Sequence, residues 1–127
     1  MEVNTRPLLY AAKHPFYVVS KEGELLSSEF DLANAKKIYM AVPVGRCCES
    51  GDAQSLDDTG LSVPRQMAEP EVGDYLVIGG GGAYCSAMSP FNYNSHEQAA
   101  ELLYTKEKNI KVIRKMQSLE QILVNEV

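Results

Sequence analysis

Residues 70–78 read Pro-Glu-Val-Gly-Asp-Tyr-Leu-Val-Ile, a turn followed at once by a short apolar run. Pro and Gly mark the turn, while Tyr, Val and Ile favour extended backbone. Four further apolar runs lie between turn residues, at residues 8–12, 16–19, 38–44 and 110–113. Five short strands with no helices between them predict an antiparallel β-barrel or β-sandwich.

Two segments near the C-terminus have helical features. Ser118 is a capping residue, and Leu119, Ile122 and Leu123 follow it at helical spacing, which predicts a helix over residues 118–126. Residues 96–106 favour a helix by intrinsic propensity alone. Their assignment therefore stays open at the level of local sequence.

The composition predicts one soluble domain. The chain has 127 residues, of which 45% are hydrophobic and 23% charged, so residues 1–127 suit a single domain. Twelve basic against seventeen acidic residues give a net charge of −5, which argues against nucleic acid as a partner. No apolar run approaches the ~20 residues of a membrane-spanning helix, so no membrane partner is expected. Three cysteines, two of them adjacent, form no disulfide framework and favour a reducing cytoplasm.

The densest polar cluster follows the apolar run at residues 38–44. Residues 46–52 read Arg-Cys-Cys-Glu-Ser-Gly-Asp, which places a thiol and a carboxylate beside the end of a predicted strand. A thiol whose pKa is tuned by neighbours can donate a proton or act as a nucleophile. The alternative interpretation is a pair of small buried cysteines followed by a solvated turn.

Three more clusters could line a site. Residues 79–85 hold four consecutive glycines before Ala-Tyr-Cys, which suits close backbone approach but lacks the Lys-Ser/Thr of a phosphate-binding loop. Residues 89–95 form an aromatic and Asn-rich loop that could line a pocket or simply form Asx-turns. Arg6 and Tyr10 flank the start of the first predicted strand, where they could bind a carboxylate.

Metal and catalytic-triad sites are not expected. His14 and His96 have no metal-ligand spacing with any Cys, Asp or Glu, and both are interpreted as surface or loop residues. The cysteines lack the C-x-x-C spacing of a structural zinc site, and no G-x-S-x-G motif is present.

The order of the clusters is more specific than any one of them. R-P-x-L-Y at residues 6–10, C-E-S-G-D at 48–52, G-A-Y at 82–84 and N-Y-N-S at 92–95 follow one another along the chain. This order resembles the C-terminal β-barrel domain of the diaminopimelate decarboxylases, which are pyridoxal-phosphate (PLP) enzymes of the alanine-racemase-like fold. The resemblance extends over essentially the whole chain. It implies an all-β fold, a Greek-key-like antiparallel β-barrel with a short C-terminal helix.

The resemblance implies a role for each matching residue. Cys48 matches the family's cysteine that faces the cofactor and donates a proton after carbon dioxide leaves. Glu49 matches the carboxylate that holds the distal ammonium of meso-diaminopimelate. Arg6 and Tyr10 match the pair that holds its distal carboxylate, and Tyr84 matches the tyrosine that reaches both cofactor and substrate. A substrate with an ammonium and a carboxylate at its far end needs one acid and one base to bind it.

The resemblance also implies what lies outside the chain. In the family, PLP is anchored by a lysine and a glycine loop of an N-terminal (β/α)8 barrel, and the active site forms at the interface of a homodimer. A (β/α)8 barrel needs well over 200 residues. The 127-residue chain alone is therefore expected to be inactive. The matching region around residues 100–104 is a strand in the family, so we expect a strand there despite its helix propensity.

Other functions fit these residues less well. Ornithine, arginine and carboxynorspermidine decarboxylases share the fold, but their substrates lack the distal carboxylate that Arg6 would bind. A non-catalytic regulatory module would have no need of Cys48, Glu49 and Tyr84. A small cysteine-dependent enzyme would need a general base that the sequence does not supply. Cys47 has no assigned role, and on a strand it would face away from Cys48.

Overall fold

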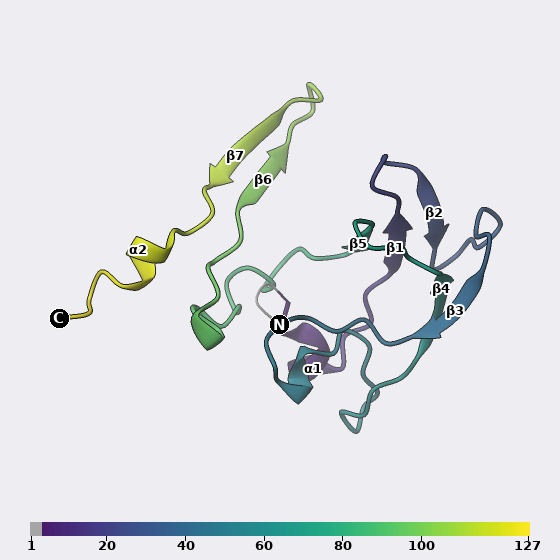
Figure 1. Cartoon of the computed structure of the whole chain (residues 1–127), viewed down its shortest axis with the longest axis horizontal. Coiled ribbons are helices and arrows are strands. Elements are labelled where there is room, and N and C mark those ends of the chain that lie inside the picture. Colours follow the sequence, from purple (N-terminus) through teal and green to yellow (C-terminus); the bar gives the residue numbers. More distant parts are fainter. Residues whose placement is uncertain (1–3) are drawn as a thin grey trace.

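The computed structural model describes residues 4–127 and consists mainly of short strands (Figure 1). Its elements, in chain order, are α1 (Arg6–Tyr10), β1 (Phe16–Val19), β2 (Leu25–Ser28), β3 (Ile38–Ala41), η1 (Ser50–Asp52), β4 (Arg65–Ala68), β5 (Tyr75–Ile78), η2 (Tyr93–Ser95), β6 (Glu101–Tyr104), β7 (Ile110–Arg114) and α2 (Leu119–Ile122).

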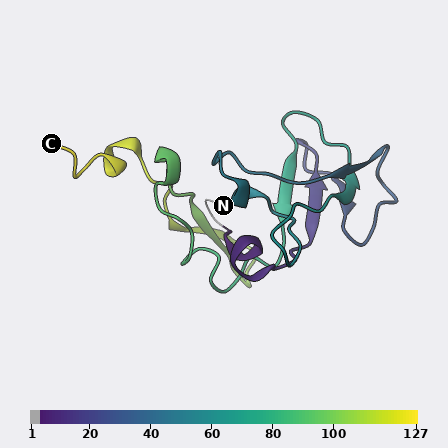
Figure 2. The same cartoon turned by 90° about the horizontal axis from the view of Figure 1, so that it is seen from below.

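All strand pairs are antiparallel. β1 lies at the centre of a three-stranded sheet between β2 and β5, β3 pairs with β4, and β6 pairs with β7. β1 to β5 gather into one body, whereas the β6–β7 hairpin and α2 extend away from it in both views (Figures 1 and 2). The prediction of an antiparallel all-β fold is confirmed.

The main core lies between β1 and β4. Phe16, Val18, Met67 and Ala68 are each at most 5% exposed and form one cluster. Phe16 and Val18 point to the same side because successive residues of a strand face opposite ways. The Arg65 guanidinium lies over the Phe16 ring, 4.2 Å from its centroid, and closes one end of this core.

The prediction of a strand at residues 8–12 is wrong. The chain instead forms the helix α1, with Pro7 in its first turn and Ala11 in the left-handed conformation (φ 49°) at its C-terminal end. Proline favours the start of a helix because its φ is already helical and its missing N–H is not needed there. The run at residues 38–44 is strand only as far as Ala41 and is cut short before Pro43.

The two predictions for the C-terminal segment are confirmed. The strand expected near residues 100–104 is β6, which pairs with β7 across the turn at residues 105–109. Pairing with a neighbouring strand thus overrides the helix propensity of this segment. The predicted helix is α2, shorter than expected, and a capping box between Ser118 and Gln121 fixes its start.

His14 lies in the loop before β1, within the interpretation as a surface or loop residue, but it is buried. It is 3% exposed, and its Nδ1 lies 2.9 Å from the carbonyl oxygen of Gly79, just after β5. The Arg65 guanidinium also donates to the His14 carbonyl at 2.7 Å. His14 therefore ties the start of β1 to the glycine run.

Large apolar side chains remain exposed on the β6–β7 hairpin. Leu102, Tyr104, Ile110, Val112 and Ile113 are each more than half exposed. Exposed apolar patches of this kind mark interaction surfaces. In the part of the chain that the structure describes, none of the helices has the length and apolar character needed to cross a membrane.

Candidate functional site

The loop that carries the two cysteines runs from the end of β3 to η1. Cys47 is fully buried, whereas Cys48 is exposed and has φ 48°, in the left-handed region that non-glycine residues seldom adopt. The two cysteines lie in a bend and not on a strand, yet they point to opposite environments. Cys48 is therefore the thiol available to a substrate.

Asp52 holds this loop from inside. Its side chain is buried, and Oδ2 accepts the Cys47 backbone N–H at 2.9 Å. The Asp52 carbonyl accepts the Gly45 N–H at 2.9 Å, which closes the loop at its base. A buried carboxylate costs free energy unless it is hydrogen-bonded, so these contacts are needed for the loop to persist.

Gly45 is the position at which this loop tolerates no side chain. A Cβ built there would overlap the Asp52 carboxylate. We expect Gly45→Ala to push Asp52 off the Cys47 amide and lower the free energy of unfolding by about 1–3 kcal/mol. Urea denaturation followed by circular dichroism measures this loss.

Gly82→Ala is the matched control, because nothing lies within 4 Å of a Cβ there and Gly82 has no positive φ. An unfolding midpoint of Gly45→Ala equal to that of Gly82→Ala would contradict the packing around Asp52.

Glu49 follows Cys48 and caps η1. Oε1 accepts the Gly51 amide at 3.2 Å and the Ser50 hydroxyl at 3.1 Å, and Oε2 accepts the Tyr93 hydroxyl at 3.0 Å. The Gly51 amide first, and then the Tyr93 hydroxyl, lower the pKa of Glu49 below its usual value. The same contact raises the pKa of Tyr93. Glu49 is thus an oriented anion at the protein surface.

Arg6 and Tyr10 lie on α1, not at the start of a strand as expected. Tyr10 is 61% exposed, and its hydroxyl lies 4.0 Å from Met88 Sδ. The Arg6 Nε is buried and has no hydrogen-bond partner within the described part of the chain. Arg6 as a whole is half-buried, so part of its side chain stays accessible to an external carboxylate.

Tyr84 lies in the turn after the glycine run. It is 65% exposed and has φ 72°, so its ring points into solvent. Of the four glycines, Gly79 lies against Pro15 and the Tyr17 ring, with a built Cβ only 2.9 Å from each. The Gly79 N–H also donates to the Pro15 carbonyl at 2.8 Å, so the close backbone approach expected of the glycine run is present at Gly79.

Asn4 connects the three predicted site segments. Its Oδ1 accepts the Arg6 amide at 3.3 Å and the Cys85 thiol at 3.5 Å, and its Nδ2 donates to Gln54 Oε1 at 3.3 Å. Gln54 Nε2 lies 3.5 Å from Asp52 Oδ1. One buried network thus runs from α1 and the Tyr84 turn to the loop beneath Cys48.

Sequence reasoning missed this network. Asn4 and Gln54 stand in no motif, and only contacts between distant segments reveal them. Asp52 could have been found, because it is the last residue of the C-E-S-G-D motif and a carboxylate there needs a partner.

The residues present suit one half of a PLP site. Cys48 and Tyr84 are exposed and could face a cofactor held by another protein segment. Within residues 4–127, no three His, Cys, Asp or Glu side chains are grouped as metal ligands would be.

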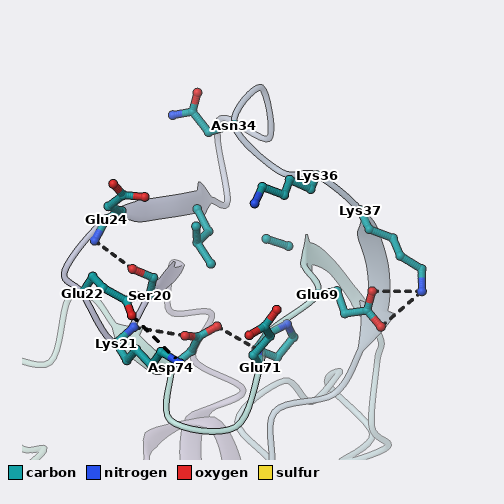
Figure 3. Close-up of a pocket in the computed structure, with 13 residues that line it drawn as sticks. Ser20, Lys21, Glu22, Glu24, Asn34, Lys36, Lys37, Glu69, Glu71 and Asp74 are labelled. Carbon is teal, nitrogen blue, oxygen red and sulfur yellow. Dashed lines mark hydrogen bonds and ion pairs between the residues drawn. The ribbon is translucent and has the colours of Figure 1, made fainter.

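A hollow of about 520 Å³ lies elsewhere, between the β1–β2 turn, the segment before β3 and the segment after β4 (Figure 3). Two of its acidic groups have partners: Lys37 Nζ lies 2.9 Å from Glu69 Oε2, and the Asp74 carboxylate accepts the backbone N–H groups of Lys21 and Glu71. None of the predicted site residues lines it.

Comparison with known proteins gives a consistent set of relatives. The chain is 31% identical over 122 residues to the diaminopimelate decarboxylase of Buchnera aphidicola subsp. Baizongia pistaciae, and 32% identical over 122 residues to that of Escherichia coli K12. It is 35% identical over 117 residues to the diaminopimelate decarboxylase of Helicobacter pylori. These alignments cover 96%, 96% and 92% of this chain but only 27%, 27% and 24% of the relatives. No family model matches the chain.

Solved structures agree with these relatives. A crystal structure of diaminopimelate decarboxylase superposes with a TM-score of 0.83 at 31% identity, over 98% of this chain and 28% of that protein. A variant of the H. pylori diaminopimelate decarboxylase complexed with L-lysine gives a TM-score of 0.74 at 32% identity, over 99% of this chain and 26% of that protein. The chain therefore spans about a quarter of these enzymes, and the resemblance seen in the sequence is confirmed.

Proposed function

We propose that this chain is the C-terminal β-barrel domain of a diaminopimelate decarboxylase, an enzyme that converts meso-2,6-diaminopimelate to L-lysine with PLP. The observation that carries the proposal is the extent of the similarity, 31–35% identity over 92–96% of the chain. The arrangement of Cys48 and Glu49 at an exposed loop supports it, because both side chains are accessible to a substrate.

Cys48 is the proposed catalytic residue of this chain. When bound, PLP withdraws electrons from the carbon that loses carbon dioxide. Cys48 holds a proton at Sγ and delivers it to that carbon, from the exposed side of the loop. Its left-handed backbone directs the side chain outward, away from the buried Cys47.

The substrate's far end is bound by charge complementarity. Glu49 is ionised and oriented by the Gly51 amide and the Tyr93 hydroxyl, which suits the distal ammonium. The half-buried Arg6 and the exposed Tyr10 suit the distal carboxylate. Tyr84 is exposed enough to contact both cofactor and substrate.

The proposal requires a second domain. An N-terminal (β/α)8 barrel supplies the lysine and the glycine loop that hold PLP, so this chain alone has no activity. The complete site forms in a homodimer. The three free cysteines support a reducing compartment, and we place the enzyme in the cytoplasm.

The isolated chain is expected to self-associate through its exposed apolar surface. Sedimentation velocity over a wide concentration range should show the mean sedimentation coefficient rising with concentration. Replacing Val112 and Ile113 on β7 with Lys should reduce this rise, because charged residues on an edge strand oppose pairing. A monomer at every concentration would contradict the expectation.

A chimera tests the proposed activity directly. This chain would replace the matched region of the E. coli enzyme, and lysine formation from meso-diaminopimelate would be measured with PLP present. We expect activity that depends on this chain's own Cys48. A chimera that folds and binds PLP but forms no lysine would contradict the proposal. Release of carbon dioxide from ornithine or arginine instead would assign the chain to another decarboxylase of the same fold.

A further inference from the structure

A second segment lies along the Cys48 loop. It comprises Tyr93–Ser95 (η2) and His96, and it is separated from the loop by more than 40 residues of sequence. Three side-chain contacts join the two: Tyr93 Oη to Glu49 Oε2 at 3.0 Å, Asn94 Nδ2 to the Cys47 carbonyl, and His96 Nε2 to the Arg46 carbonyl at 3.3 Å. The contacts fall on both sides of Cys48 in the sequence and leave Cys48 itself exposed.

The backbone of this second segment is strained. Asn94 and Ser95, like the preceding Asn92, have left-handed φ values of 52°, 59° and 55°. Asn adopts this region more readily than most residues, whereas Ser seldom does, so the strain falls on Ser95. Such strain persists only where surrounding contacts impose it, and it concentrates at functional sites. Besides its own backbone hydrogen bonds, Ser95 N–H to Asn92 and His96 N–H to Tyr93, the segment is held by the side-chain contacts to the Cys48 loop.

The geometry points to Tyr93 and Asn94 as positioning residues, which together hold Glu49 and Cys48 in the orientation that the reaction requires. This inference rests on the proposed function, in which Glu49 binds the substrate and Cys48 donates the proton.

Tyr93 acts on Glu49. The Gly51 amide and the Ser50 hydroxyl bind Oε1, so the Tyr93 hydroxyl is the group that fixes Oε2. With both oxygens held, the carboxylate cannot rotate and stays ionised for the distal ammonium of the substrate. Loss of the Tyr93 hydroxyl should therefore weaken substrate binding more than it slows the chemical step.

Asn94 acts on Cys48 through Cys47. The Cys47 N–H donates to Asp52 Oδ2, and the Cys47 carbonyl accepts from Asn94 Nδ2. The backbone N–H and the carbonyl of Cys47 are thus both fixed, so Cys48 cannot relax from its left-handed conformation. Loss of the Asn94 amide should release Cys48 and slow proton delivery while leaving substrate binding largely intact.

NMR on the 127-residue chain tests both contacts without any activity. Tyr93→Phe should raise the pKa of Glu49 toward the usual glutamate value, as read from the titration of its carboxyl carbon. Asn94→Gly should weaken the intraresidue amide–Hα NOE of Cys48, which is strong at positive φ. Glycine accommodates the φ of 52° at residue 94, so this variant removes the side-chain contact without adding strain.

Tyr104→Phe and Asn34→Ala are the matched controls, because both residues are exposed and lie outside the Cys48 loop. Neither should move the Glu49 titration or the Cys48 NOE. An unchanged Glu49 pKa in Tyr93→Phe, or an unchanged Cys48 NOE in Asn94→Gly, would overturn the role of that residue.

The chimera adds a kinetic readout. Tyr93→Phe should raise KM about three- to tenfold with little change in kcat, and Asn94→Gly should lower kcat by a similar factor, as expected for one hydrogen bond each. Equal changes of kcat and KM in both variants would indicate a merely structural role and overturn the inference. An inactive parent chimera would count against the proposed function. The Glu49 pKa and the Cys48 NOE would still show whether Tyr93 and Asn94 hold these two residues.

Discussion

Replacing Cys48 with glycine in the chimera is expected to lower kcat for lysine formation by about 10²- to 10⁴-fold, the usual contribution of a general acid. Glycine is the informative substitution because Cys48 has φ 48°, a conformation that glycine adopts freely. The loss of rate then reports the missing thiol and not a strained backbone. The measurement is the rate of lysine formation at saturating meso-diaminopimelate.

The neighbouring thiol supplies the control. Cys47→Ala removes the buried sulfur but keeps both backbone contacts of residue 47, to Asp52 and to Asn94. Its kcat should stay within a few-fold of the parent chimera. If Cys47→Ala lost the rate and Cys48→Gly kept it, the proton donor would be Cys47 and the assignment of the motif would be reversed.

Phe16→Ala is expected to cost the largest amount of stability, about 3–5 kcal/mol of the free energy of unfolding. Phe16 is 4% exposed, packs in the β1–β4 core and lies beneath the Arg65 guanidinium, so alanine leaves a cavity and removes the ring that the cation covers. A domain of this size has about 5–15 kcal/mol in total. Urea denaturation at fixed pH should therefore show a large fall in the midpoint.

Phe30→Ala makes the same chemical change at a position that is 81% exposed. Its unfolding midpoint should lie close to that of the unchanged chain, since exposed sites rarely alter stability by more than about 0.5 kcal/mol. Equal effects of the two substitutions would show that β1 and β4 do not form the core.

Local sequence located four of the seven strands and missed β2 and β4. β1, β5 and β7 begin and end within a residue of their predicted bounds, because turn residues bracket runs of β-branched and aromatic residues. Local sequence failed to predict α1. The apolar run at residues 8–12 suggested a strand, although Pro7 favours the start of a helix. For β6, intrinsic propensity favoured a helix, and only the family resemblance predicted the strand.

The predicted site depended on that resemblance as well. Local sequence marked the C-E-S-G-D loop as chemically interesting but left open which cysteine was accessible. The structure shows Cys47 buried and Cys48 exposed, whereas the catalytic and binding roles of Cys48, Glu49, Arg6, Tyr10 and Tyr84 stay predictions.

The sequence by itself determined the strand-rich class, the turn positions and the motifs, because these depend on the preferences of neighbouring residues. Only the tertiary structure decided which distant groups meet. Asn4 joins α1 to the Tyr84 turn and to Gln54, and Tyr93 reaches Glu49 across 44 residues. Such contacts depend on how separate segments pack, and no local pattern encodes them. Nor could the sequence predict the burial of His14, since its partner Gly79 lies 65 residues away.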